Sequence, residues 1–155
     1  MKQTETKELK MGIDVGSTTT KIVVLGGDGE ELLFSDYERH HSQQLASVKR
    51  ALQMVDQQFS DADFHVAMTG SGAKSLAEEL GLSYVQEVVA NSIVLKSRYK
   101  EIGTAIELGG QDAKIIFFRK DRDTGKPKVS DMRMNGSCAG GTGAFIDEIA
   151  SLLKT

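Results

Sequence analysis

The most telling stretch of this sequence reads Gly12-Ile-Asp14-Val-Gly16-Ser17-Thr18-Thr19-Thr20-Lys21. An apolar segment ends on a carboxylate, a short run of small residues follows, and a β-branched segment begins, which predicts a hairpin between two strands. Glycines let the backbone approach a ligand and direct N–H groups at phosphate oxygens, and the hydroxyls add donors. A loop of this kind suits a polyphosphate, with the carboxylate available to Mg²⁺ or its water ligands.

A second loop of the same kind reads Ile106-Glu107-Leu108-Gly109-Gly110-Gln111-Asp112-Ala-Lys114. Either loop alone could be an ordinary hairpin with a polar turn. The presence of two acidic glycine hairpins in one chain favours a shared role in binding phosphate. The sequence contains no G-x-x-x-x-G-K-[ST] motif, which argues against a P-loop NTPase, and no G-x-G-x-x-G after the first strand, which argues against a Rossmann site.

The rest of the sequence predicts an α/β fold with a mixed β-sheet, an antiparallel three-strand meander and flanking helices. Strands are predicted over residues 9–15, 19–25, 31–40, 64–69, 104–108, 113–119 and 129–134. Helices are predicted over residues 42–59, 73–80, 88–99 and 141–153 from apolar spacings of three and four. Ser42 is the predicted N-cap of the first helix, and Gly81 the predicted end of the second. Residues 1–9 are predicted to form a flexible lead-in.

Composition restricts the class of protein. The chain has 155 residues, of which 39% are apolar and 26% charged, which is enough for one domain with a core. Its net charge of −3 argues against broad binding to nucleic acid or to anionic membranes. No apolar run approaches the roughly 20 residues that cross a bilayer, and no signal peptide is evident. We therefore expect a cytoplasmic protein that binds neither nucleic acid nor membrane.

The only cysteine, Cys138, lies in Asn135-Gly-Ser-Cys138-Ala-Gly-Gly-Thr-Gly143, just before the last predicted helix. The N-terminus of a helix stabilises a thiolate, which is the form that ligates iron. A small buried residue and a catalytic nucleophile are the alternatives, although no histidine has an evident relation to it. We expect the three histidines, His40, His41 and His65, at the surface or at strand edges.

These motifs carry a resemblance to a known family. Asp14-x-Gly16-Ser17 with Lys21, and Glu107-x-Gly109-Gly110-Gln111-Asp112, resemble the two phosphate loops of the actin, sugar-kinase and heat-shock-chaperone ATPase superfamily, which has a ribonuclease H-like fold. Cys138-Ala-Gly-Gly-Thr-Gly143-Ala-Phe-Ile-Asp147 resembles a narrower family. This is the BadF/BadG/BcrA/BcrD type of ATPase, which includes activators of 2-hydroxyacyl-CoA dehydratases. The resemblance runs from about Met11 to the end of the chain.

The resemblance implies ATP or ADP and Mg²⁺ as ligands. Asp14 and Glu107 would position Mg²⁺ through its waters. Glu107 and Gln111 would be the catalytic residues, with Gln111 orienting the hydrolytic water; many smaller members have Asp in place of Glu107. The residues implied to bind the nucleotide are Asp14, Gly16, Ser17, Thr18, Thr19, Lys21, Gly109, Gly110, Gln111 and Asp112.

The family's dimer is expected to share one [4Fe–4S] cluster, held by two cysteines from each subunit. Cys138 would be one ligand, whereas the second cysteine, the adenosine-binding loop and the second lobe would lie beyond Thr155. The resemblance thus implies that residues 10–155 form the first lobe of an actin-like ATPase and are inactive alone. The longer protein would be a homodimer or would pair two ATPase modules. Its partner would be a CoA-ester dehydratase or reductase with its own iron–sulfur centre.

Two other functions fit the same fold. A small-molecule kinase of this superfamily would leave the Cys138 motif without a purpose. A non-enzymatic assembly ATPase would polymerise with nucleotide and would need no electron acceptor.

Overall fold

The computed structural model describes residues 7–110, 112–135 and 143–153. The chain divides into two compact units, Met1–Glu87 and Val88–Thr155. The first unit contains β1 (Lys7–Val15), β2 (Thr19–Leu25), β3 (Leu32–Arg39), α1 (Gln44–Gln58), β4 (Ala62–Thr69), α2 (Lys74–Leu80) and β5 (Ser83–Tyr84). The second contains α3 (Glu87–Arg98), β6 (Thr104–Leu108), β7 (Ala113–Lys120), β8 (Pro127–Met134) and α4 (Gly143–Leu153).

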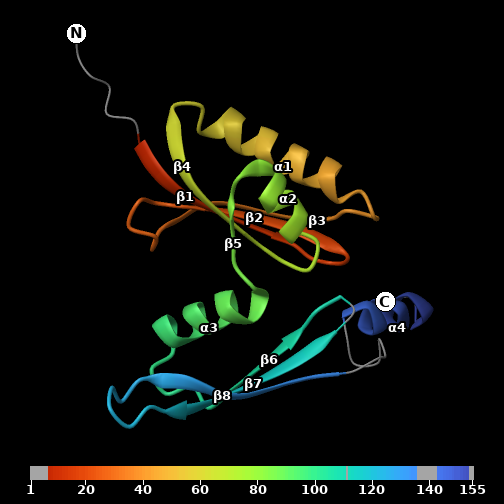
Figure 1. Cartoon of the computed structure of the whole chain (residues 1–155). Helices are drawn as coiled ribbons and strands as arrows, with labels where there is room; N and C mark the ends of the chain where they lie inside the picture. Colours follow the sequence, from red (N-terminus) through yellow and green to blue (C-terminus); the bar gives the residue numbers. More distant parts are fainter. Residues whose placement is uncertain (1–6, 111, 136–142, 154–155) are drawn as a thin grey trace. The chain divides into compact units, whose positions relative to one another are not determined.

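The first unit is built on a five-stranded mixed sheet in the order β3-β2-β1-β4-β5. β1, β2 and β3 form the predicted antiparallel meander, whereas β4 pairs with β1 in parallel. The connection that returns the chain from β3 to β4 contains α1, which runs along the sheet (Figure 1). A helix in a crossover of this kind covers a sheet face.

Alternation along β1 separates a helix-covered face from an open one. The side chains of Leu9, Ile13 and Val15 are almost wholly buried, and they share a core with residues of α1 and α2. Successive side chains of a strand point to opposite faces, so Asp14 lies on the face away from this core. Its register partner in β2, Lys21, lies on the same face. The fold therefore presents this pair of charged residues on the side of the sheet that α1 and α2 do not cover.

One carboxylate on β3 connects α1 to the sheet. Glu38 of β3 accepts hydrogen bonds from the Ser47 hydroxyl, at 3.0 Å, and from the Arg50 guanidinium, both on α1. The Arg50 guanidinium, helped by Ser47, holds the pKa of Glu38 below its ordinary value. These contacts fix the end of β3, and His40 is the first residue after that strand.

The second unit contains an antiparallel sheet in the order β6-β7-β8, preceded by α3 and followed by α4. The β6 and β7 strands pair from Thr104↔Phe117 to Leu108↔Ala113, so Gly109 and Asp112 stand at the two ends of the hairpin loop. The buried side chains of β7 alternate, with Lys114, Ile116 and Phe118 on one face. A lysine in this buried row is unusual and belongs to the candidate site.

The predicted fold class is confirmed, with differences at several boundaries. β1 begins at Lys7, within the predicted lead-in, and β8 begins at Pro127, two residues before the predicted start. Gly81 ends α2 in the left-handed conformation, as predicted. The prediction for Ser42 is wrong, because α1 has Gln43 at its N-cap and makes no side-chain cap hydrogen bond. The two-residue strand β5 was not predicted, because Ser83–Tyr84 is too short to show periodicity.

Candidate functional site

The first acidic hairpin places a carboxylate and an ammonium group in direct contact. Lys21 Nζ lies 2.7 Å from Asp14 Oδ2, and the two side chains are 44% and 30% exposed. Lys21 Nζ also lies 5.8 Å from the centre of the Tyr37 ring, on the next strand of the sheet. Thr69, the register partner of Asp14 in β4, continues this row of side chains. The row forms a polar strip at the end of β1, on the open face, where a ligand can reach both charges.

The loop between β1 and β2 is closed by a hydrogen bond within its own backbone and is held by contacts with His40. The Gly16 N–H donates to the Thr19 carbonyl at 2.9 Å, and the His40 N–H donates to the Thr18 carbonyl at 3.2 Å. His40 Nε2 lies 3.1 Å from the Gly16 carbonyl oxygen. His40 is only 2% exposed, so the predicted surface position is wrong for it, although it does lie directly after β3, the edge strand of the sheet. Its burial depends on the loop folding back over it, which local sequence does not reveal.

A glycine turn from another part of the chain packs against the end of β1. The Gly72 N–H donates to the Val15 carbonyl at 2.8 Å. Gly70 has φ +107°, and a Cβ there would lie 2.2 Å from the Val15 carbonyl oxygen and 2.6 Å from Asp14 Oδ1. Only glycine allows the two backbones to approach this closely. The turn between β4 and α2 thus fixes the position from which Asp14 projects.

The second acidic hairpin is closed in the same way. The Gly109 N–H donates to the Asp112 carbonyl at 2.8 Å, as Gly16 does to Thr19 in the first loop. A Cβ on Gly109 would lie 2.6 Å from Asp112 Oδ1, so the glycine makes room for the aspartate side chain. Gln111, predicted to orient the hydrolytic water, lies outside the described residues.

Glu107 is held by two residues that the sequence interpretation did not assign to the site. Asn91 of α3 donates from Nδ2 to Glu107 Oε2 at 2.8 Å. Lys114 Nζ lies 3.7 Å from Glu107 Oε1 and 3.3 Å from Asp112 Oδ2, with its side chain 7% exposed. A buried cation between two carboxylates fixes both of them. The position of Lys114, seven residues after Glu107 across a hairpin, could have indicated this contact, whereas no local signal marks Asn91.

Cys138 also lies outside the described residues, but the chain on either side of its segment is anchored to the second hairpin. Asn135 donates from its backbone N–H to the Ala113 carbonyl at 3.1 Å, and its side-chain oxygen accepts from the Ala113 N–H at 2.7 Å. The Gly143 N–H, at the first residue of α4, donates to the Gly109 carbonyl at 2.8 Å. Asn135 and Gly143 are therefore both hydrogen-bonded to residues at the two ends of the hairpin loop, Ala113 and Gly109.

The donors present suit a hydrated metal ion held with a phosphate. Within residues 7–110, 112–135 and 143–153, no three His, Cys, Asp or Glu side chains gather into a metal-binding group. Mg²⁺ commonly keeps several waters and takes only one or two carboxylates together with substrate phosphates. Asp14 and Glu107 each meet that requirement as single carboxylates beside a glycine loop.

No helix in the described part of the chain has the length and apolar character needed to cross a membrane.

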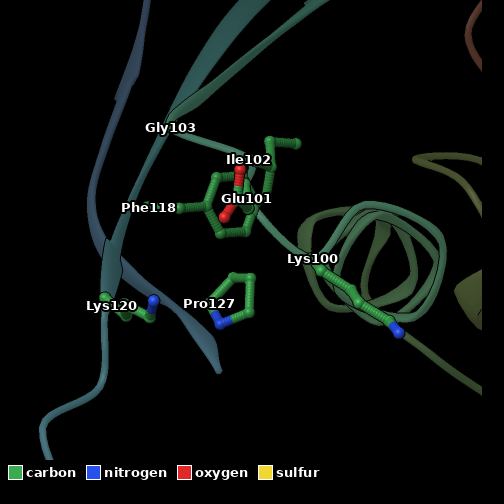
Figure 2. A pocket seen from close by; sticks show the side chains of 7 residues that line it. All are labelled: Lys100, Glu101, Ile102, Gly103, Phe118, Lys120 and Pro127. Carbon is green, nitrogen blue, oxygen red and sulfur yellow. The ribbon is translucent and has the colours of Figure 1, made fainter. Parts of the chain in front are cut away.

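A small pocket in the second unit is separate from the glycine loop. Its volume is about 270 Å³, and its walls include Gly103, Phe118, Lys120 and Pro127 (Figure 2). These residues lie at the start of β6, the end of β7 and the start of β8, whereas Gly109 follows the opposite end of β6. The five residues of β6 separate the two places by roughly 17 Å. The pocket therefore does not belong to the phosphate loop.

A mixed sheet with an antiparallel meander, flanking helices and acidic glycine hairpins is the architecture of an actin-like ATPase lobe. The chain belongs to the BadF/BadG/BcrA/BcrD ATPase family, whose model matches residues 11–155. The resemblance inferred from the motifs is thus confirmed.

Named relatives support the family assignment. The chain is 31% identical over 147 residues to the (R)-2-hydroxyglutaryl-CoA dehydratase activating ATPase of Acidaminococcus fermentans, covering 93% of this chain and 53% of that protein. It is 28% identical over 148 residues to the activator of lactoyl-CoA dehydratase of Anaerotignum propionicum, covering 94% and 54%. The solved structure of the activator of the 2-hydroxyisocaproyl-CoA dehydratase from Clostridium difficile, with bound ADPNP, is 27% identical with a TM-score of 0.74, covering 95% of this chain and 53% of that one. The chain spans about half the length of these relatives.

Proposed function

We propose that this chain is the first, ATP-binding lobe of an ATP-hydrolysing activator that transfers electrons to a CoA-ester dehydratase or reductase. The observation that carries the proposal is the pair of backbone-closed acidic glycine hairpins in a chain of this ATPase family. The relatives named as dehydratase activators, one with bound ADPNP, support both the nucleotide and the class of partner. A second lobe outside this sequence would complete the nucleotide site.

In the proposed site the first hairpin binds phosphate. Ser17, Thr18 and Thr19 supply hydroxyls, Ser17 and Thr18 also supply backbone N–H groups, and Lys21 supplies a positive charge. The Gly16 N–H closes the loop onto the Thr19 carbonyl, and the absence of a side chain at Gly16 leaves room for phosphate. A bound nucleotide changes the partner of Lys21, because phosphate oxygens compete with Asp14 for the ammonium group. The Asp14 carboxylate, released from Lys21, would then be available to the waters of Mg²⁺, and the ion would supply positive charge against the phosphate. The exposure of both side chains makes this exchange of partners inexpensive.

The second hairpin is proposed to act on hydrolysis. Glu107, fixed by Asn91 and Lys114, presents its carboxylate in one orientation, as a group that positions Mg²⁺ or the attacking water must. Gly110 would contact phosphate through its backbone, Gly109 and Asp112 would support the loop through the hydrogen bond that closes it, and Gln111 would orient the water.

The anchoring of residues 135 and 143 connects this hairpin to the cysteine segment. Asn135 and Gly143 are bonded to Ala113 and Gly109, so a displacement of the loop on loss of the γ-phosphate shifts both anchors. A [4Fe–4S] cluster takes four thiolates, and this chain has one cysteine, so the chain by itself does not provide the ligand set. Cys138 would supply one thiolate, with the others from the longer protein or from a second copy in a dimer.

Binding of MgATP tests the proposed phosphate site. Asp14→Asn and Lys21→Ala, made in the intact protein, should each abolish nucleotide turnover and weaken MgATP binding, as measured by calorimetry. Asp131→Asn is the matched control, because Asp131 also pairs with a cation, Arg133 at 3.2 Å, on an exposed part of β8. Unchanged turnover in both loop variants would refute the assignment of this hairpin.

A further inference from the structure

His40 is a buried residue that contacts the first hairpin through both its ring and its backbone. It directly follows β3, is 2% exposed, and places Nε2 at 3.1 Å from the Gly16 carbonyl oxygen, 24 residues away. Its backbone N–H donates to the Thr18 carbonyl. One buried residue thus holds two successive parts of the loop, at Gly16 and at Thr18.

The contacts of the ring determine which nitrogen carries the proton. The Ser42 backbone N–H donates to His40 Nδ1 at 3.1 Å, and a backbone N–H can only donate. Nδ1 must therefore be the unprotonated nitrogen, and Nε2 carries the hydrogen. Nε2 then donates to the Gly16 carbonyl oxygen, which can only accept. Both ring nitrogens are satisfied in this neutral tautomer.

The hydrogen bond to Gly16 orients an amide of the loop. In a trans peptide unit the carbonyl of one residue and the N–H of the next point in opposite directions in one plane. Because the Gly16 carbonyl points at the buried His40 ring, the Ser17 N–H points away from it. His40 thereby fixes the direction of one of the N–H groups proposed to bind phosphate.

The chain adopts an unfavourable conformation next to His40. His41 has φ 47° and Ser42 has φ 65°, two consecutive non-glycine residues in the left-handed region. Each such residue is disfavoured, and backbone strain of this kind persists only where surrounding structure enforces it. Here the turn brings the Ser42 N–H back onto Nδ1 of His40, which is the contact that selects the tautomer.

We propose that His40 is a positioning residue for nucleotide phosphate, which acts by fixing the Gly16–Ser17 peptide of the first loop. The inference rests on the proposed function. His40 does not itself contact the nucleotide; it aligns the amide that does. Losing this alignment should weaken binding of MgATP about tenfold, which is the change in Kd expected for the loss of one hydrogen bond.

Two amide substitutions separate the contacts of the two ring nitrogens. His40→Gln places an N–H donor near the position of Nε2 and can keep the bond to Gly16. His40→Asn places its amide near the position of Nδ1, so it can accept from Ser42 but does not reach Gly16. His65→Gln is the control, because the side chain of His65 is 74% exposed on β4 of the same unit. His40→Ala replaces the asparagine variant if that variant does not fold, since alanine also lacks the contact with Gly16.

The measurement is the Kd for MgATP by calorimetry on the intact protein, with thermal unfolding of each variant recorded alongside. We expect His40→Gln to bind within about threefold of the unaltered protein and His40→Asn to bind about tenfold more weakly. Equal affinity in the unaltered protein and in His40→Asn would overturn this inference but not the proposed function. Equal weakening in both amide variants would have the same consequence. No binding of MgATP by the unaltered protein would refute the proposed function, and this inference with it.

Discussion

Replacing Gly70 by alanine should destabilise the first unit far more than an ordinary glycine substitution. The Cβ would lie 2.2 Å from the Val15 carbonyl oxygen and 2.5 Å from its carbon, which are backbone atoms of β1, the central strand, and cannot move aside cheaply. The φ of +107° adds about 1–3 kcal/mol of backbone strain. Overpacking at a rigid site adds about 1–3 kcal/mol more. We therefore expect the free energy of unfolding to fall by about 4 kcal/mol.

Gly81→Ala is the matched control. Gly81 also has a positive φ, +65°, but a Cβ there would meet nothing within 4 Å. Its substitution should cost only the backbone strain, about 1–2 kcal/mol. Urea unfolding followed by circular dichroism compares the two variants. A difference of about 2 kcal/mol or more, roughly thirtyfold in the unfolding equilibrium, is expected. Equal costs would refute the argument that Gly70 is required by its contact with β1.

Two further predictions concern charged side chains. Lys114→Ala removes a buried cation that fixes two carboxylates and should lower the free energy of unfolding by about 2 kcal/mol. Lys128 is the control, because its side chain is 62% exposed. Lys128→Ala should change the free energy of unfolding by less than about 0.5 kcal/mol in the same urea titration. Glu38→Gln should lower stability at pH 7, because Arg50 holds the pKa of Glu38 below its ordinary 4.5 and the stabilisation is present above that value. The difference from the unaltered protein should shrink as pH falls below 4.5, and a difference that does not shrink with falling pH would contradict the assignment.

The hairpins could be predicted from sequence because their signals are local. An apolar strand, a carboxylate, small residues and a second apolar strand specify a turn without any distant contact, and β2 and β6 have the predicted bounds. Apolar periodicity also predicted α1, although Leu45, one of the apolar residues at this spacing, is 68% exposed. Periodicity indicates a face but does not show how far along the helix a neighbouring layer extends.

What could not be predicted depends on residues distant in sequence. His40 lies 24 residues from the Gly16 carbonyl that it contacts, and nothing in the His40-His41 pair shows which ring is buried. Asn91 reaches Glu107 from a helix whose packing is not encoded in either loop. The strict need for glycine at position 70 follows from its approach to β1, which the residues around Gly70 do not show by themselves. The contacts that support each loop are thus tertiary contacts between distant residues, whereas the loops themselves are specified by local sequence.

The most direct test of the central claim is the iron content of the intact protein, purified without oxygen, in its unaltered form and as Cys138→Ser. Iron and sulfide analysis, with electron paramagnetic resonance after reduction, measures the cluster, and calorimetry measures MgATP binding in the same samples. The account predicts a reducible iron–sulfur signal in the unaltered protein, its loss in Cys138→Ser, and MgATP binding in both. Absence of a cluster from both forms after reconstitution, with MgATP still bound, would contradict the electron-transfer function and favour a kinase.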